Sequence, residues 1–146
     1  HKNIVYLHNN VVVVDGVALV GSNGWFGNYT PVDDIDDIRQ EMLYHEDISY
    51  TSTTVEKLQL HPDVKKIVMI TNSVPAKELF FGELPPKVDD IGPSIAIIQD
   101  TERKISHWVF GSHKKIVDTV ISNINYINNA SHRTEPYWAK RFEVIV

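Results

Sequence analysis

The sequence contains no cysteine. Disulfide bonds, thiolate metal sites and a cysteine nucleophile are therefore excluded, although this absence leaves the cellular compartment undecided. No apolar run approaches the roughly 20 residues that a membrane-spanning helix needs, and no signal-peptide pattern opens the chain. We therefore expect a soluble protein that does not use a membrane as a partner.

Positive charge is also scarce in this chain. Lys and Arg number 14 against 19 Asp and Glu, which gives a net charge of -5. This balance argues against nonspecific binding to nucleic acid. The 146 residues, 42% hydrophobic and 23% charged, predict a single domain over residues 1–146 with its own core. Because the chain begins with His1, we expect a processed chain or part of a longer one.

Strand patterns are the most frequent local signal. Two valine-rich runs, 11–14 and 17–20, flank Asp15-Gly16, which predicts a hairpin with a type I′ turn. Both runs are almost continuously apolar, so we expect this sheet to be covered on both faces. Ser122-Asn123 predicts a second hairpin. The remaining strand candidates, with the two arms of that hairpin, are residues 3–7, 66–71, 107–110, 115–121, 124–128 and 142–146.

Helical patterns are fewer. Asp33 or Asp34 is expected to cap a helix that runs to about Tyr44. A second, short helix is expected over residues 54–60, ending before His61-Pro62 because proline disfavours helical geometry in the preceding residue. Residues 94–101 are ambiguous between helix and strand, and we prefer a helix. Since strands outnumber helices, the chain is predicted to form an α/β or α+β sandwich.

Two loops at strand ends are the candidate sites. Asn72 follows the strand predicted at 66–71, and Ser112 follows the strand predicted at 107–110. We expect both loops on one rim of the sheet, where binding residues are common. The tight polar cluster His45-Glu46-Asp47 is explained more simply by exposed charge at a helix end. The sequence has no nucleophile elbow, Walker loop or dinucleotide fingerprint.

The order of five landmarks carries a family resemblance. NIVYL, VVVVDGVALVGSNGW, KIVMITNSVP, WVFGSHKKIVD and INYINNASHRTEPYW are together similar to the C-terminal half of a calcineurin-like metallophosphoesterase, over nearly the whole chain. The resemblance implies a phosphoesterase-type β-sandwich, with two mixed sheets packed face to face and helices outside. It also implies a partial domain, because the family's N-terminal Asp-His, Gly-Asp and Gly-Asn-His motifs are missing.

The resemblance breaks at the metal ligands. Asn72 stands in the place of the histidine in the family's Thr-His-x-x-Pro pattern, and Ser112 and Lys114 stand in the two histidine places of Gly-His-x-His. A hydroxyl and an amide oxygen bind transition metals less well than imidazole nitrogen, and an ammonium group repels a cation. A one-residue slip would bring His113 to a ligand place, but successive side chains point in different directions.

These replacements predict a noncatalytic metallophosphoesterase-like domain, without a cofactor, that serves as a structural or interaction module. The alternative is an active metal-dependent phosphoesterase or nuclease that binds manganese or zinc, with its remaining ligands supplied by a missing N-terminal segment or another chain.

Two further groups of residues are candidate contacts. The first is a basic patch that would hold a phosphate without metal, or a partner, through charge-assisted hydrogen bonds; its members are His113, Lys114, Lys115, Arg133, Lys140 and Arg141. Its alternative is a solvated loop with scattered lysines. The second is the aromatic pair Tyr137-Trp138, a candidate interface with a protein partner or in a homo-oligomer.

Overall fold

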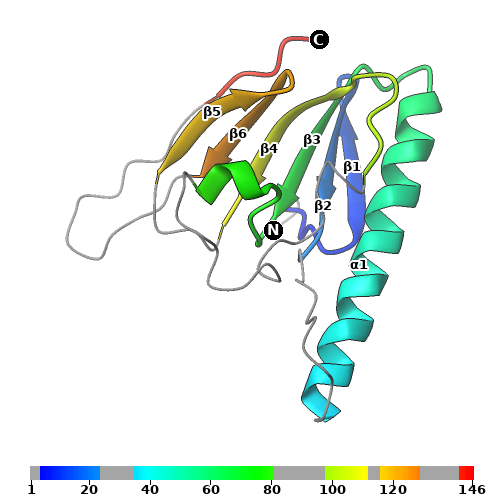
Figure 1. Cartoon of the computed structure of the whole chain (residues 1–146). Coiled ribbons are helices and arrows are strands. Elements are labelled where there is room, and N and C mark those ends of the chain that lie inside the picture. The colour runs from blue at the N-terminus through cyan, green and yellow to red at the C-terminus, as the bar shows by residue number, and fades with distance from the viewer. Residues whose placement is uncertain (1–3, 24–34, 81–97, 112–115, 129–141) are drawn as a thin grey trace.

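The described part of the chain forms one mixed sheet with helices. The computed structural model describes residues 4–23, 35–80, 98–111, 116–128 and 142–146 (Figure 1). Its strands are β1 (Asn10–Val14), β2 (Val17–Gly21), β3 (Lys66–Thr71), β4 (Ile105–Phe110), β5 (Val117–Ile121) and β6 (Ile124–Asn128). Its helices are α1 (Ile35–Leu60) and the 3-10 helix η1 (Lys77–Phe80). The expected mixed α/β class is therefore confirmed.

The six strands lie in the order β1-β2-β3-β4-β6-β5. The inner neighbours β2, β3, β4 and β6 are parallel, whereas β1 and β5 pair antiparallel with β2 and β6. Both outer pairs are the hairpins predicted from the sequence. Asp15 and Gly16 have φ of 48° and 81°, and Ser122 and Asn123 have φ of 51° and 68°. Positive φ at both central residues is the property of a type I′ turn, so turn chemistry places both edges of the sheet.

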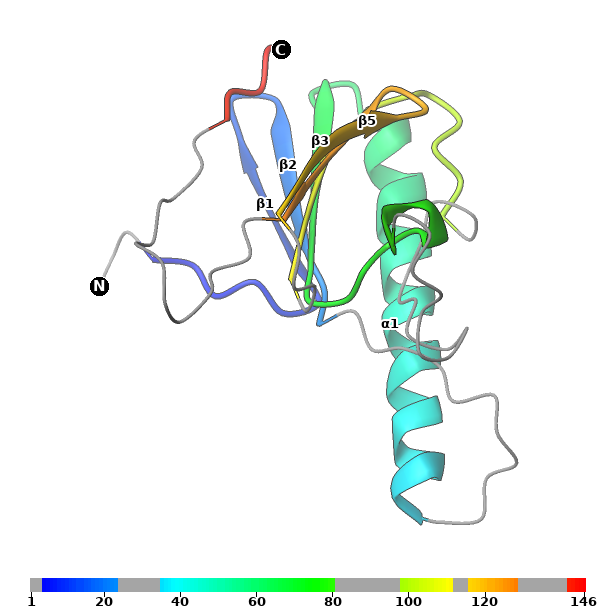
Figure 2. The same cartoon turned by 60° about the vertical axis from the view of Figure 1, so that its left-hand side comes forward.

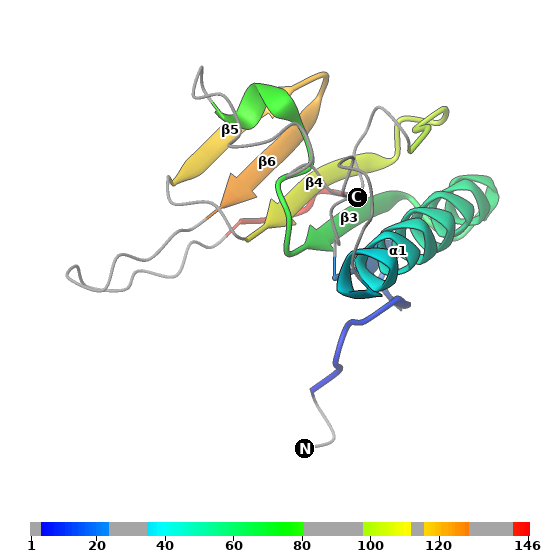
Figure 3. The same ribbon diagram turned by 60° about the horizontal axis from the view of Figure 1, so that its bottom comes forward.

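The hydrophobic core lies on the α1 side of the sheet. Figure 2 shows α1 and η1 on one side of the sheet and the C-terminal residues 142–146 on the other, and Figure 3 shows η1 beside β5 and β6. Val55 of α1 and Leu79 of η1 are fully buried there together with Trp108. The other buried apolar members of the core cluster are Ala18, Val20, Val64, Ile67, Met69, Val74, Ala76, Ile98, Ile105, Phe110, Val117, Ile124 and Tyr126.

A β-bulge in β4 brings extra apolar surface into this core. The pairing of β3 with β4 shifts between Ile67 and Val68, so that Ile67 lies opposite Ile105 while Val68 lies opposite His107. Ser106 is the additional residue. Because of it, Ile105 and Trp108, three residues apart, are both buried, whereas an uninterrupted strand would place them on opposite faces.

One continuous helix replaces the two helices predicted from the sequence. α1 runs for 26 residues, from Ile35 to Leu60. Tyr44, Thr51 and Val55 are buried along one stripe at helical spacing, and this packing outweighs the low helix propensity of the Ser and Thr residues between them. His45-Glu46-Asp47 is consequently in mid-helix, not at a helix end, and His45 Nε2 lies 2.9 Å from Glu41 Oε1. The predicted end before His61-Pro62 is confirmed.

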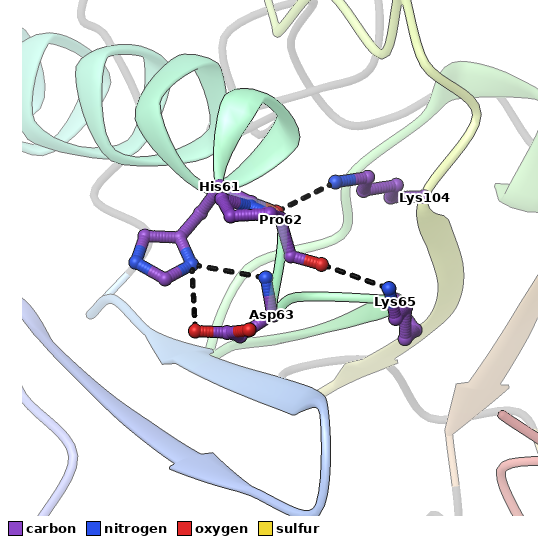
Figure 4. Close-up of polar contacts among 5 residues, drawn as sticks. All are labelled: His61, Pro62, Asp63, Lys65 and Lys104. Atoms are coloured by element: carbon purple, nitrogen blue, oxygen red, sulfur yellow. Dashed lines mark hydrogen bonds and ion pairs between the residues drawn. The ribbon is translucent and has the colours of Figure 1, made fainter.

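Two lysine side chains donate hydrogen bonds to carbonyl groups of the residues that directly follow α1 (Figure 4). Lys104 Nζ donates to the His61 carbonyl at 3.1 Å, and Lys65 Nζ donates to the Pro62 carbonyl at 2.8 Å. Cations at this position also interact favourably with the helix dipole. His61 Nδ1 in turn accepts from the Asp63 backbone N–H at 3.3 Å. The end of α1 is thereby tied to the start of β3 and β4.

Gln59 fastens the last turn of α1 to the segment before β4. Its side-chain amide donates to the Gln99 carbonyl at 2.6 Å, and its Oε1 accepts from the Glu102 backbone N–H at 2.7 Å and from Thr101 Oγ1 at 3.2 Å. Residues 98–101 form a bend and the start of a turn, so the helix preferred for residues 94–101 is wrong over its described part. Residues 94–97 lie outside the described residues.

Two predicted strands do not form. Residues 4–7 and 142–146 have no regular secondary structure, although their sequences have high β propensity. Tyr6 is 77% exposed and Ile145 is 81% exposed. A strand requires a hydrogen-bonding neighbour, and neither segment pairs with a strand in the described part of the chain. Local propensity therefore failed because strand formation depends on non-local pairing.

The face of the sheet opposite α1 is apolar and incompletely covered. Phe142 stacks on His107 of this face, with ring centroids 5.0 Å apart. Leu19, Ile70 and Val109 are half-buried, and Val14 is 53% exposed. The expectation that the first hairpin is covered on both faces is therefore wrong at β1. The described strands also form one sheet, not the two that the family resemblance implies.

Candidate functional site

The candidate site lies where parallel strands end together. Thr71 is the last residue of β3 and lies opposite Phe110, the last residue of β4. Asn72 and Gly111 follow at once, so these two predicted loops begin side by side on one rim. β2 is parallel to β3 and ends at the same rim. In open α/β sheets, ligands bind outside the carboxyl ends of such strands.

Main-chain hydrogen bonds join the three strand ends. Ser22 N–H donates to the Ile70 carbonyl at 3.0 Å, and Asn72 N–H donates to the Asn23 carbonyl at 3.2 Å. Gly111 N–H donates to the Thr71 carbonyl at 3.1 Å. The backbone on both sides of Asn72 is therefore fixed by hydrogen bonds to the neighbouring strand ends, and the rim continues the hydrogen bonding of the sheet.

The buried hydroxyl of Thr71 hydrogen-bonds to the loop that contains Asn72. Thr71 Oγ1 donates to the Ser73 carbonyl at 3.0 Å and accepts from the Trp108 indole N–H, also at 3.0 Å. Trp108 is fully buried and stacks on Tyr126, with the two ring centroids 6.2 Å apart. The indole needs a hydrogen-bond acceptor once it leaves water, and the threonine that also sets the loop supplies it. Core packing and loop geometry are coupled through this one oxygen.

Gly111 permits close approach of the two loops. A Cβ at this position would lie 3.1 Å from Asn72 Oδ1 and 3.3 Å from the Asn72 carbonyl oxygen. Either contact is tighter than ordinary van der Waals separation. The small residue thus lets the amide of Asn72 reach the start of the second loop, which is the juxtaposition expected for two loops that share a site.

The side chains that the structure describes at this rim are neutral. Asn72 is exposed, and its amide offers an oxygen and a nitrogen but no charge. Ser73 is 4% exposed, and its Oγ has no hydrogen-bond partner among the described residues. Amide, hydroxyl and peptide groups can orient a polar ligand, but they are weak ligands for transition metals compared with imidazole. At its described positions, the rim favours polar recognition over metal chemistry.

Most of the other predicted site residues lie outside the described residues. These are Ser112, His113, Lys114 and Lys115 of the second loop, Arg133, Lys140 and Arg141 of the basic patch, and the aromatic pair Tyr137 and Trp138. The structure therefore brings Asn72 to the residue that precedes Ser112 and does not place the remaining candidates.

The described histidines are dispersed. His8 lies before β1, His45 lies within α1 and His61 directly follows α1. Within the described ranges, no group of three or more His, Asp and Glu residues could hold a metal ion. His107 has a structural setting: its Nδ1 lies 3.0 Å from Ser106 Oγ, and its ring stacks on Phe142. Burial lowers the pKa of His107, and the nearby Lys66 charge lowers it further. The neutral ring is favoured there.

Sequence reasoning missed the residues that support the site. Ser22 and Asn23 carry no sequence pattern that predicts a site, although the parallel pairing of β2 with β3 brings them to the rim. Thr71 was treated only as a strand residue, and the sequence gives no sign that its hydroxyl meets Trp108. The threonine at the end of an apolar strand was the one available signal, since a polar residue there needs a partner.

Comparisons with known proteins do not extend this description. A scan against protein-family models gives no match, and a search of the curated proteins gives none either. Among the described residues, no helix has the length and apolar character of a membrane span. The function is therefore argued from the residues and their geometry.

Proposed function

We propose that this chain is a noncatalytic metallophosphoesterase-like domain that serves as a structural or interaction module. The observation that carries the proposal is the position of Asn72, at the carboxyl end of β3 and in close contact with Gly111 at the end of β4. The family resemblance puts a metal-binding histidine at this place. The two strand ends that would present such a ligand are adjacent, and the side chain at this position is an amide.

The chemistry of the rim supports a noncatalytic role. A two-metal phosphoesterase needs its cations to clamp the phosphate and to lower the pKa of a bound water. Such cations need several anionic or imidazole ligands at one place. Asn72 contributes a neutral oxygen, and the sequence places Ser112 and Lys114 at the two further histidine positions. The proposal follows from the joint replacement of the three imidazoles.

The second face of the sheet supports an interaction role. Leu19, Ile70 and Val109 are half-buried apolar residues on the face opposite the main core. A phosphoesterase-type sandwich would cover such a face with a second sheet. We propose that a protein partner, or a second copy of the chain, covers the parts of these side chains that remain exposed.

Metal titration combined with a hydrolysis assay tests the proposal. Calorimetry with Mn²⁺ and Zn²⁺ should show no stoichiometric binding, and a generic aryl phosphate should not be hydrolysed in their presence. Tight one-to-one or two-to-one binding with turnover would instead support the active metal-dependent enzyme. In that case, we would expect the remaining ligands to come from another segment or chain.

A restored variant tests whether the ligand positions are correctly assigned. Replacing Asn72, Ser112 and Lys114 by histidine should raise Mn²⁺ affinity by at least about tenfold, since imidazole is a far better ligand than the present groups. No gain would mean that the three positions do not form a metal pocket.

The matched control carries three added histidines at exposed positions on separate elements. Thr53→His, Glu102→His and Val120→His add the same number of imidazoles without bringing them together. A similar gain in the control would show that the restored variant binds metal nonspecifically.

A further inference from the structure

The strand β1 is an edge of the sheet with an open side. It pairs only with β2 in the sheet that the structure describes. Val13 is 51% exposed, and Val14 at the end of the strand is more exposed still. An edge strand presents backbone N–H and C=O groups to any chain that can extend the sheet.

β1 lacks the features that usually protect such an edge. Natural edge strands carry charged residues, proline or a bulge that prevent pairing with another sheet. The sequence of β1 is NVVVV, and its register with β2 is continuous from Asn10 to Val14. The opposite edge differs, because the second residue of β5 is the exposed acid Asp118. Of the two edges of the described sheet, β1 is thus the one suited to pairing.

The hairpin determines which backbone groups of β1 point outward. Val14 and Val17 flank the two-residue turn, and such a flanking pair exchanges both of its hydrogen bonds. Because this direction alternates along a strand, Val12 faces β2 in the same way. The N–H and C=O groups of Val11 and Val13 are therefore directed to the open side of the sheet.

We propose that β1 pairs antiparallel with β1 of a second copy, around a two-fold axis at Val12. In this register Val11 lies opposite Val13 of the second copy, and Val13 opposite Val11, so all four outward groups of each strand find partners. Asp15 then lies opposite Asn9 of the second copy, and no like charges are opposed. The two six-stranded sheets become one continuous sheet.

Closure favours a second copy over other extended segments. A two-fold interface uses the same strand in both copies, so the pairing consumes both open edges and cannot propagate. The combined sheet ends in β5 on both sides, where Asp118 opposes further addition. This inference deepens the proposed function, because it names a partner of the interaction module, but it depends on β1 and not on the rim at Asn72.

Sedimentation velocity over a wide range of concentration tests the dimer. The wild-type chain should shift from 16.7 kDa toward twice that mass as its concentration rises. Val13→Lys should remain monomeric at every concentration, because it puts a charge on the paired edge. Val120→Lys is the matched control: Val120 is 65% exposed on β5, and this variant should dimerise as the wild type does. Far-UV circular dichroism verifies that both variants are folded.

Amide hydrogen exchange locates the interface. The amides of Val11 and Val13 should exchange more slowly as the protein concentration rises, whereas the outward amide of Val120 should not change. A monomer at all concentrations overturns the proposal, as does a dimer that Val13→Lys leaves intact. Slow exchange of both valines in a monomer would show that the chain itself covers the edge, which also overturns it. Since metal binding is measured separately, failure here leaves the noncatalytic assignment standing.

Discussion

The hydroxyl of Thr71 should contribute far more to stability than its size indicates. Thr71→Val keeps the shape of the side chain but removes the oxygen that accepts from Trp108 and donates to the Ser73 carbonyl, both at 3.0 Å. Each neutral hydrogen bond contributes about 1 kcal/mol, and a buried donor without a partner costs about 1–3 kcal/mol. Because Trp108 is fully buried, we expect Thr71→Val to lower the free energy of unfolding by about 2–4 kcal/mol.

Thr71→Ser distinguishes the contribution of the hydroxyl to stability from that of the methyl group. It retains both hydrogen bonds and loses one buried methyl, so it should cost only about 1 kcal/mol. Urea unfolding followed by tryptophan fluorescence measures both variants. Equal losses for Thr71→Val and Thr71→Ser would refute the reasoning, because the hydroxyl would then contribute nothing specific.

A double-mutant cycle tests the pairing directly. In a Trp108→Phe background, which has no indole donor to satisfy, Thr71→Val should cost about 1–2 kcal/mol less than in the wild type. Strictly additive losses would mean that the two side chains do not interact in solution. Domains of this size have a total stability of about 5–15 kcal/mol, so the single variants should remain folded at 25 °C.

Two further predictions concern the elements around the site. The pKa of His107 is lowered in the folded state, so the unfolded chain binds a proton more readily. The free energy of unfolding should therefore keep its full value above pH 6.5 and fall as the pH drops through that value. His107→Gln should remove this part of the pH dependence in urea titrations between pH 5 and 8. Gln59→Leu breaks the hydrogen bonds to Gln99, Thr101 and Glu102, and it should cost about 2–3 kcal/mol in thermal unfolding, whereas exposed Lys57→Leu on the same turn should change stability little.

Features determined by short-range chemistry could be predicted from the sequence. The Asp15-Gly16 turn, β3 with its observed bounds and the end of α1 before Pro62 all follow from local preferences. A type I′ turn needs residues that tolerate positive φ, and proline disfavours helix in the residue before it, whatever surrounds them. β4 was also predicted, but it begins two residues earlier than expected, at Ile105.

Features that depend on distant partners could not be predicted. The stripe that buries α1 includes Asp47 and Thr51, and a pattern of apolar residues does not reveal buried polar ones. Residues 142–146 have a strand composition but no strand neighbour in the part of the chain that the structure describes. At the candidate site, the position of two loops at strand ends was enough to predict that Asn72 and the second loop share one rim. The hydrogen bond between Trp108 and Thr71 spans 37 residues, and no local pattern indicates it.

Manganese broadening of amide NMR signals tests the central claim most directly. The claim is that the rim formed by Asn72 and Gly111 does not hold a divalent cation. Paramagnetic Mn²⁺ at a fraction of the protein concentration should leave the signals of these two residues as sharp as those of the distant turn at Ser122. Selective loss of the Asn72 and Gly111 signals under the same conditions would contradict the account.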